Sequence, residues 1–164
     1  MPNDTLTAQL LTPQLLPLVD SGHWYVAFSG GLDSTVLLHL LHSWCRHHPG
    51  APALVAVHIN HGLAAEADGW QAHCQSFCDS LGVELLARTI AVNTEGRGVE
   101  AAAREGRYRV FEDLLAATDN LFMGHHLDDQ VETFFLRLLR GAGLHGLAAM
   151  PVSRSLGEGL LQRP

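Results

Sequence analysis

Short apolar runs alternate along the chain with longer stretches in which apolar residues recur at helical spacing. The short runs are rich in β-branched and aromatic residues, which is typical of buried strands. The longer stretches place apolar residues three and four positions apart, as an amphipathic helix does. We therefore expect strands at 24–28, 53–59, 83–90 and 120–123, and helices at 4–20, from about 33, at 65–81, at 99–117 and at 128–139.

This alternation predicts one α/β domain over residues 1–164. Strands that are separated by helices run parallel and are joined by right-handed crossovers, which puts helices on both faces of the sheet. We expect a Rossmann-like parallel sheet of this kind, with no internal repeat and no linker. Ligands of such sheets bind beyond the carboxyl ends of the strands, where the strand order reverses.

The last residues of the chain, 159–163, begin a further β-rich run that stops at Pro164. A natural domain rarely ends inside a strand. We therefore expect that this fifth strand is truncated and that the chain is part of a longer protein; a short terminal tail is the alternative. A truncated strand would leave an exposed sheet edge.

Composition narrows the possible chemistry. The formal net charge is −7, and all ten basic residues are arginine, so lysine is absent. That absence excludes a Walker-type phosphate lysine and a lysine nucleophile. The acidic balance argues against a broad nucleic-acid surface on this segment alone. Three cysteines, no apolar run of membrane-spanning length and no signal-like amino terminus favour a cytoplasmic protein.

A candidate phosphate loop lies between the first strand and the helix after it, and it comprises Ser29, Gly30, Gly31, Leu32, Asp33 and Ser34. Two glycines allow the backbone to approach a ligand closely, and the N–H groups at a helix start attract anions. Asp33 suits this position if it holds Mg²⁺ or a cationic substrate. On spacing alone, an ordinary strand–turn–helix junction with a serine or aspartate cap explains the same letters equally well.

A second cluster of polar residues opens the helix after the fourth strand, and it comprises Gly124, His125, His126, Asp128, Asp129 and Glu132. Asp129 and Glu132 are three positions apart, so their carboxylates share one helix face. Carboxylates at the carboxyl end of a strand suit Mg²⁺ or an ammonium group. The helix dipole also favours acidic residues in a first turn, but capping needs fewer polar groups than occur here.

The phosphate loop resembles the S-G-G-x-D-S pyrophosphate loop of the N-type ATP pyrophosphatases, which split ATP into AMP and pyrophosphate. Three further segments are similar to motifs of one family in that superfamily, the tRNA(Ile)-lysidine synthases. They are V-H-I-N-H-G-L at 57–63, A-R-E-G-R-Y-R-V-F at 103–111, and H-H-L-D-D-Q-V-E-T from 125 onward. These motifs occur in the family's order and cover most of the chain.

The resemblance implies the chemistry of that family. ATP and Mg²⁺ would adenylate C2 of the first anticodon cytidine of tRNA(Ile), which has a CAU anticodon, and the amine of free L-lysine would displace AMP to give lysidine. Ser29 to Ser34 would hold the pyrophosphate portion of ATP, with Asp33 and Asp129 as candidate magnesium ligands. Asp129 and Glu132 suit the amines of lysine by charge. The resemblance also allows a homodimer.

The roles of several residues stay open at this level. Arg104 could pair with a carboxylate or phosphate through its planar fork, or extend along its own helix at the surface. His58 and His125 lie at expected strand ends, either as adenine-site or catalytic groups or as hydrogen-bonded structural histidines. Cys74 and Cys78 are one helical turn apart, which more often means buried packing than a metal pair. The tryptophans show no base-stacking spacing.

Two other functions fit parts of the sequence. A tRNA thiolase of the same superfamily also adenylates a nucleobase but delivers sulfur, which typically requires paired cysteines, and the chain has no C-x-x-C. A non-catalytic nucleotide-binding protein of the universal stress type would have a similar sheet. It would need neither Asp33 nor the acidic cluster at 128–132.

Overall fold

The computed structural model describes residues 7–62, 67–91, 98–124 and 151–164. The helix expected at 128–139 lies outside these ranges. Within them, none of the helices is long and apolar enough to cross a membrane. The expected strands are β1 (His23–Ala27), β2 (Ala53–Asn60), β3 (Glu84–Thr89) and β4 (Asn120–Phe122), and the long helices are α2 (Leu32–His47), α3 (Ala67–Leu81) and α4 (Val99–Leu114).

The amino-terminal segment differs from the single helix expected at 4–20. Its described part consists of short pieces in succession, which are η1 (Ala8–Leu11), α1 (Thr12–Leu15) and η2 (Leu16–Leu18). Pro13 and Pro17 explain the difference, because a proline has no N–H to donate and interrupts an α-helical hydrogen-bond ladder. The segment still packs against α2: Leu15 is fully buried, and the Trp44 indole N–H donates to the Thr12 hydroxyl at 3.0 Å.

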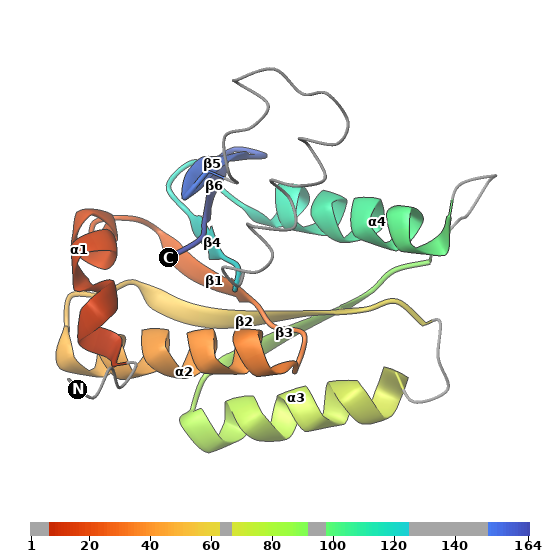
Figure 1. Cartoon of the computed structure of the whole chain (residues 1–164), viewed down its shortest axis with the longest axis horizontal. Helices are drawn as coiled ribbons and strands as arrows, with labels where there is room; N and C mark the ends of the chain where they lie inside the picture. The colour runs from red at the N-terminus through yellow and green to blue at the C-terminus, as the bar shows by residue number, and fades with distance from the viewer. Residues whose placement is uncertain (1–6, 63–66, 92–97, 125–150) are drawn as a thin grey trace, which may run out of the picture.

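Six strands of the described ranges form one sheet, in the order β3-β2-β1-β4-β6-β5. β1 pairs in parallel with β2 on one side and with β4 on the other. The chain therefore builds the sheet outward from β1 in one direction and then returns to add β4 on the opposite side (Figure 1). The strand order reverses between β1 and β4, which is the place where ligands of open α/β sheets bind.

The carboxyl-terminal run forms β6 (Gly159–Gln162), the expected fifth strand, and a strand that we did not expect, β5 (Ser153–Leu156), precedes it. β6 pairs in parallel with β4 and antiparallel with β5, so β6 is an interior strand and β5 forms the edge. The expectation that the last strand leaves an exposed edge is therefore wrong. Gly157 turns the chain between the two strands with a φ of +56°, and a Cβ there would lie 2.5 Å from the Glu112 carbonyl oxygen on α4.

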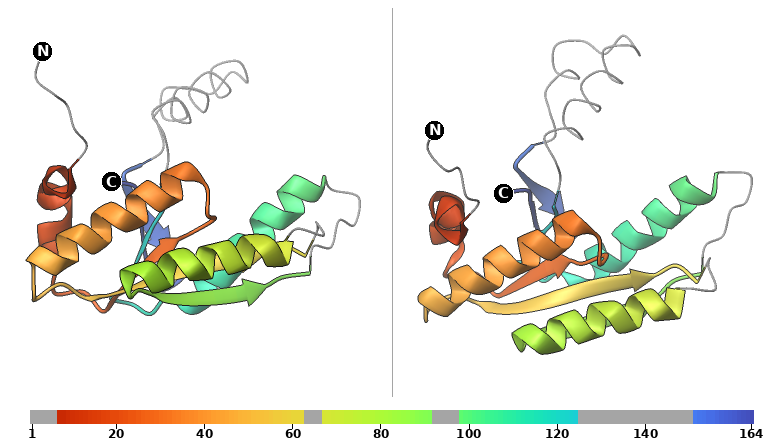
Figure 2. Two further views of the ribbon diagram at one scale, coloured as in Figure 1. Left: turned by 90° about the horizontal axis from the view of Figure 1, so that it is seen from below. Right: turned by 60° about the horizontal axis from the view of Figure 1, so that its bottom comes forward.

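Helices cover both faces of the sheet, as expected (Figures 1 and 2). α2 and α3 lie on one face over an aromatic core, in which the Trp24 ring lies 5.5 Å from Trp44 and 5.2 Å from Phe122 between ring centres. α4 lies on the other face, where Phe111 is buried in a second core with Leu121. The carboxyl ends of the strands are therefore the positions at which we expect a ligand to bind.

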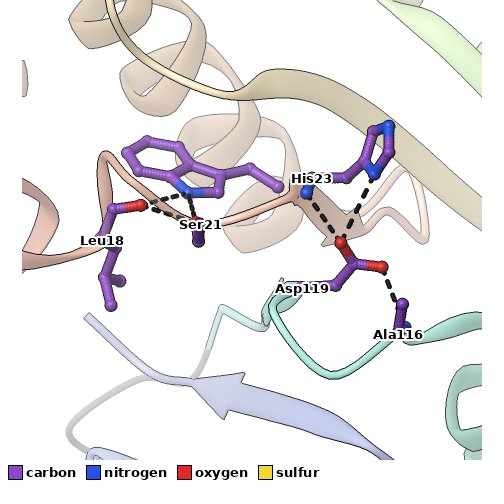
Figure 3. A network of polar contacts seen from close by, with 6 residues as sticks. Leu18, Ser21, His23, Ala116 and Asp119 are labelled. Atoms are coloured by element: carbon purple, nitrogen blue, oxygen red, sulfur yellow. Dashed lines mark hydrogen bonds and ion pairs between the residues drawn. The ribbon is translucent and has the colours of Figure 1, made fainter.

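Asp119 ties the amino ends of β1 and β4 together (Figure 3). One carboxylate oxygen accepts a hydrogen bond from the His23 backbone N–H at 2.7 Å, and the other accepts one from the Ala116 N–H at 2.9 Å. The His23 ring nitrogen lies 3.4 Å from the same carboxylate. Burial acts to raise the pKa of Asp119, but these hydrogen bonds and the His23 ring outweigh it and lower the pKa.

We expect Asp119→Asn to lower the free energy of unfolding by about 2 kcal/mol at neutral pH, because one of the two acceptor oxygens is replaced by an NH2 group, which cannot accept a hydrogen bond from a backbone N–H. The pKa of Asp119 is lowered on folding. The carboxylate therefore contributes its full stabilisation at pH values above 3.8, the pKa of Asp119 in the unfolded chain. This contribution is lost as the pH falls through the lower pKa of the folded protein. Urea denaturation of both proteins from neutral pH to about pH 3 measures the difference. A gap that stayed constant over this range would contradict the assignment.

Candidate functional site

The carboxyl end of β1 leads directly into a tight turn and the start of α2. The Phe28 N–H donates to the Val57 carbonyl at 2.8 Å, which extends the β1–β2 ladder by one residue. Gly30 then adopts a φ of +81°, which L side chains rarely adopt. Gly31 is the N-cap residue of α2. The turn thus places the first N–H groups of α2, and the positive end of its dipole, at the carboxyl edge of the sheet.

Two serines hold the loop in this shape. The Ser34 hydroxyl accepts from the Ser29 N–H at 3.2 Å, lies 3.1 Å from the Ser29 hydroxyl and donates to the Gly31 carbonyl at 3.0 Å. The Gly31 N–H donates back to the Ser29 hydroxyl at 3.3 Å, and the Thr35 hydroxyl donates to the Gly31 carbonyl at 2.9 Å. The predicted loop is therefore one closed turn. The side chain of Leu32 is exposed, so Leu32 contributes to the loop only through its backbone.

The end of β4 meets this turn. A Cβ on Gly124 would lie 3.2 Å from the Asp33 carbonyl oxygen and 3.4 Å from the Asp33 Cβ, so the two strand ends come together at the first turn of α2. The described residues contain no group of three or more metal-ligating side chains. One carboxylate beside a helix start nevertheless fits Mg²⁺, which proteins commonly bind through one or two carboxylates, with phosphate oxygens and waters as the other ligands.

His58 is buried at the carboxyl end of β2. Its Nδ1 donates to the Phe28 carbonyl at 2.9 Å, and the Cys74 Sγ lies 3.4 Å from the same nitrogen. Because a carbonyl can only accept, we place the ring hydrogen on Nδ1. Phe28 directly precedes the phosphate loop, so His58 fixes the entry to it. The hydrogen bond of Nδ1 agrees with a structural role for His58, and a contact of the ring with adenine stays a prediction.

The cysteines of α3 pack beneath the loop. Cys74 and Cys78 are fully buried in the core, as their spacing favoured. Burial raises the pKa of both thiols, that of Cys78 to about 11, so both are protonated at neutral pH. A Cβ on Gly30 would lie 2.9 Å from the Cys74 Sγ. Position 30 is therefore restricted to glycine both by its φ and by its neighbour.

Two further polar or aromatic residues lie on this side of the sheet, Asn60 at the end of β2 and Trp70 on α3, and only Trp70 is near the loop. The Asn60 amide nitrogen lies 3.4 Å from an Asp68 carboxylate oxygen and 3.3 Å from the Gln71 side-chain oxygen, and so links the end of β2 to α3. The indole of Trp70 is 55% exposed and lies 3.8 Å from a Cβ placed on Gly30. Asn60 belongs to a motif at 57–63 that could have signalled it, whereas no spacing signals Trp70.

The other predicted site residues are not brought to the loop by the described part of the chain. Arg104 is exposed on α4, and its guanidinium lies 5.5 Å from the centre of the Tyr108 ring, one helical turn further on. This contact matches an arginine that extends along its own helix, and a carboxylate or phosphate partner stays a prediction. His125, Asp129 and Glu132 lie outside the described residues, so their roles also stay predictions.

A family model described as the PP-loop domain matches residues 4–164. The chain belongs to the PP-loop family. Over 150 residues it is 56% identical to the tRNA(Ile)-lysidine synthase of Pseudomonas putida, covering 92% of this chain and 35% of that protein. Over 160 residues it is 48% identical to the tRNA(Ile)-lysidine synthase of Legionella pneumophila strain Paris, covering 97% of this chain and 36% of that protein. The chain thus spans little more than a third of the length of these PP-loop relatives.

Among solved structures, the chain is similar to the U34-tRNA thiolase NcsA from Methanococcus maripaludis with its 4Fe–4S cluster. The TM-score is 0.61, with 20% sequence identity, and the match covers 85% of this chain and 54% of that chain. At this identity the likeness shows the fold alone. It agrees with the expected Rossmann-like sheet with helices on both faces, which is confirmed.

We expect Gly30→Ala to destabilise the protein more than Gly82→Ala, which is a matched control. Both glycines have a positive φ, +81° and +67°, so an alanine at either position costs about 1–2 kcal/mol in backbone strain. The added Cβ at Gly30 also meets the buried Cys74 Sγ at 2.9 Å, whereas nothing lies within 4 Å at Gly82. Urea denaturation of both variants separates the two effects. Equal losses of stability would show that Cys74 does not constrain the loop.

Proposed function

We propose that this chain is the ATP-binding catalytic part of a tRNA(Ile)-lysidine synthase, which attaches free L-lysine to C2 of the first cytidine of a CAU anticodon. The observation that carries the proposal is the S-G-G-L-D-S turn at the switch point of the sheet, where Gly124 packs on Asp33. The name of the relatives, which match more than nine-tenths of this chain, supports it.

The phosphate loop would hold the pyrophosphate portion of ATP. The N–H groups of the loop and of the first turn of α2 would donate to phosphate oxygens, and Gly30 and Gly31 carry no side chains that keep the phosphates away. Because the chain has no lysine, the positive charge for these phosphates comes from the helix dipole, from arginine and from Mg²⁺. Asp33 and Asp129 would hold the ion, which neutralises the departing pyrophosphate.

The reaction would run in two steps. The C2 oxygen of cytidine bonds to the α-phosphorus of ATP, and pyrophosphate leaves. The lysine amine then bonds to C2 and loses a proton, while the C2–oxygen bond breaks and AMP leaves with that oxygen. Asp129 and Glu132 would bind the amines of lysine by charge, Arg104 suits a carboxylate or a phosphate, and His125 is a candidate catalytic group.

The cysteines disfavour a tRNA thiolase. Cys74 and Cys78 have no exposed surface, and burial raises the pKa of Cys45 to about 11. Buried, protonated thiols suit neither sulfur delivery nor cluster binding. Asp33 disfavours a non-catalytic nucleotide-binding protein, since a carboxylate beside bound phosphates repels them unless a cation lies between. The cysteines are all unpaired, which suits a reaction in the cytoplasm.

The direct test uses the complete protein that contains this chain, with ATP, Mg²⁺, labelled L-lysine and a transcript of tRNA(Ile). We expect release of AMP that depends on lysine, and label in the tRNA. Sulfur incorporation with a sulfur donor in place of lysine would instead identify a thiolase. Binding of ATP without release of AMP would identify a non-catalytic protein.

We expect Asp33→Ala to abolish adenylation of the tRNA while the fold is kept. The replacement removes a magnesium ligand but only about 1 kcal/mol of capping or dipole energy. Glu100→Ala is the control, because Glu100 lies in the first turn of α4 and its loss removes a comparable dipole interaction. Adenylated tRNA is measured with the complete protein, and circular dichroism reports the fold. Near-normal adenylation by Asp33→Ala would exclude Asp33 from the mechanism.

We expect Asp129→Asn and Glu132→Gln to weaken the use of lysine more than the use of ATP. Each variant keeps the side-chain size but removes a charge that suits an ammonium partner. Steady-state kinetics with lysine and ATP varied in turn should give a raised KM for lysine, by about tenfold or more. An unchanged KM for lysine with a raised KM for ATP would exclude both residues from lysine binding and leave them only as magnesium or nucleotide ligands.

A further inference from the structure

Three arginines from separate parts of the chain gather around one tyrosine. The Arg104 guanidinium lies 5.5 Å from the centre of the Tyr108 ring, and that of Arg154, on β5, lies 5.4 Å from it. Arg163, which follows β6, donates to the Pro151 carbonyl at 3.0 Å, and its pKa is lowered by burial and affected by Tyr108 and by the charges of Arg154 and Arg104. We call Arg104, Tyr108, Arg154 and Arg163 the Tyr108 cluster. An aromatic ring attracts a cation over its face, but it does not neutralise three positive charges.

The positive charge of the Tyr108 cluster is uncompensated within the described ranges. None of its arginines forms an ion pair with a carboxylate of residues 7–62, 67–91, 98–124 or 151–164. The pKa of Tyr108 responds to this positive charge. Burial acts to raise the pKa of Tyr108, but the hydrogen bond from Arg154 and the charges of the arginines outweigh burial and lower it. The buried Nε of Arg163 has no hydrogen-bond partner. Such a site favours an anion.

The Tyr108 cluster lies at the same edge of the sheet as the phosphate loop. The Tyr108 hydroxyl lies 4.0 Å from the Met123 Sδ, and Met123 immediately precedes Gly124, which packs on Asp33. Arg163 follows the carboxyl end of β6, where the Met123 N–H donates to the Gln162 carbonyl at 3.0 Å. In the sheet order, β6 and β5 follow β4 on one side, and β1, which leads into the phosphate loop, lies on the other. The cluster is therefore separated from the loop by the end of β4, on the face of the sheet that α4 covers.

We infer that the Tyr108 cluster binds phosphate groups of the RNA strand that lie next to the target nucleotide. This inference rests on the proposed function, which brings a nucleotide base to the same edge of the sheet. A guanidinium group can donate two parallel N–H hydrogen bonds to two oxygens of one phosphate. Two guanidinium groups over one ring, with a third arginine nearby, exceed what a single carboxylate can engage, and they suit a strand with a phosphate at every nucleotide. In a chain of net charge −7, RNA contacts must be concentrated in such a patch.

The test measures binding of a tRNA(Ile) transcript to the complete protein, without ATP or lysine, at several salt concentrations. The variants are Arg104→Gln and Arg154→Gln. Arg109→Gln is the matched control, because Arg109 lies on α4, makes the same change of charge and forms an ion pair with Glu105 outside the cluster. We expect each cluster variant to weaken binding by roughly five- to tenfold. The slope of log Kd against log salt should fall by about 0.7–1 for each variant.

Two further measurements keep the result decisive. Arg154→Lys keeps the charge but not the fork, so it should retain the salt slope while losing part of the affinity. Thermal unfolding identifies any variant that does not fold, and Arg104→Gln, an exposed helix position, then carries the test. The inference would be overturned if Arg104→Gln and Arg154→Gln bound the transcript no more weakly than the control Arg109→Gln. This holds whether the three variants all keep the affinity or all lose it equally. A fall in melting temperature with unchanged affinity would make the cluster structural and would also overturn it.

The same samples separate this inference from the proposed function. Lysine incorporation by the parent protein, together with full binding by the cluster variants, would remove the inference and keep the function. No lysine incorporation by the parent, together with weakened binding by the cluster variants, would remove the function and keep the RNA site.

Discussion

The site depends on the carboxyl ends of β1 and β4 meeting with almost no side chain between them. Gly30 turns the chain at a positive φ above Cys74, and Gly124 lies within van der Waals contact of the Asp33 backbone. A side chain at either glycine would push the strand end away from the first turn of α2. The start of α2, which provides the N–H groups, is therefore positioned by close backbone packing. His58 completes this arrangement, because it holds the last carbonyl before the loop from the neighbouring strand.

The sequence predicted the parts of the fold in which periodicity is strong. The strands and the long helices have apolar patterns of several residues, and tertiary packing only shifts their ends. It failed where the pattern is short or broken. The two prolines divide the amino-terminal helix, although its leucines keep a helical spacing. β5 has the sequence S-R-S-L with one fully buried residue, Leu156, so pairing with β6 rather than its own hydrophobicity makes it a strand.

The site was predictable only as far as local sequence determines geometry. The loop could be found because a turn, a glycine pair and a helix start are adjacent in the chain. The hydrogen bond from His58 to Phe28 spans thirty residues, and the contact of Trp70 with the loop depends on how α3 crosses the sheet. A motif can nominate such residues but cannot say whether a side chain faces a ligand or a carbonyl. For His58 the structure shows a carbonyl.

The two faces of the sheet carry different polar groups at the carboxyl ends of the strands. On the α2 and α3 side, glycine backbone, a helix start and one carboxylate form the proposed site for phosphates and a metal ion, to which the described residues contribute no lysine or arginine. On the α4 side, arginines from a helix and from a hairpin converge on Tyr108 with no carboxylate partner in the described ranges. In the proposed function, backbone dipoles would bind negative charge on one side of the sheet and guanidinium groups would bind it on the other. In the proposed reaction, ATP and RNA would approach the same reacting atoms, and this separation would keep the two polyanions from competing for one cationic site.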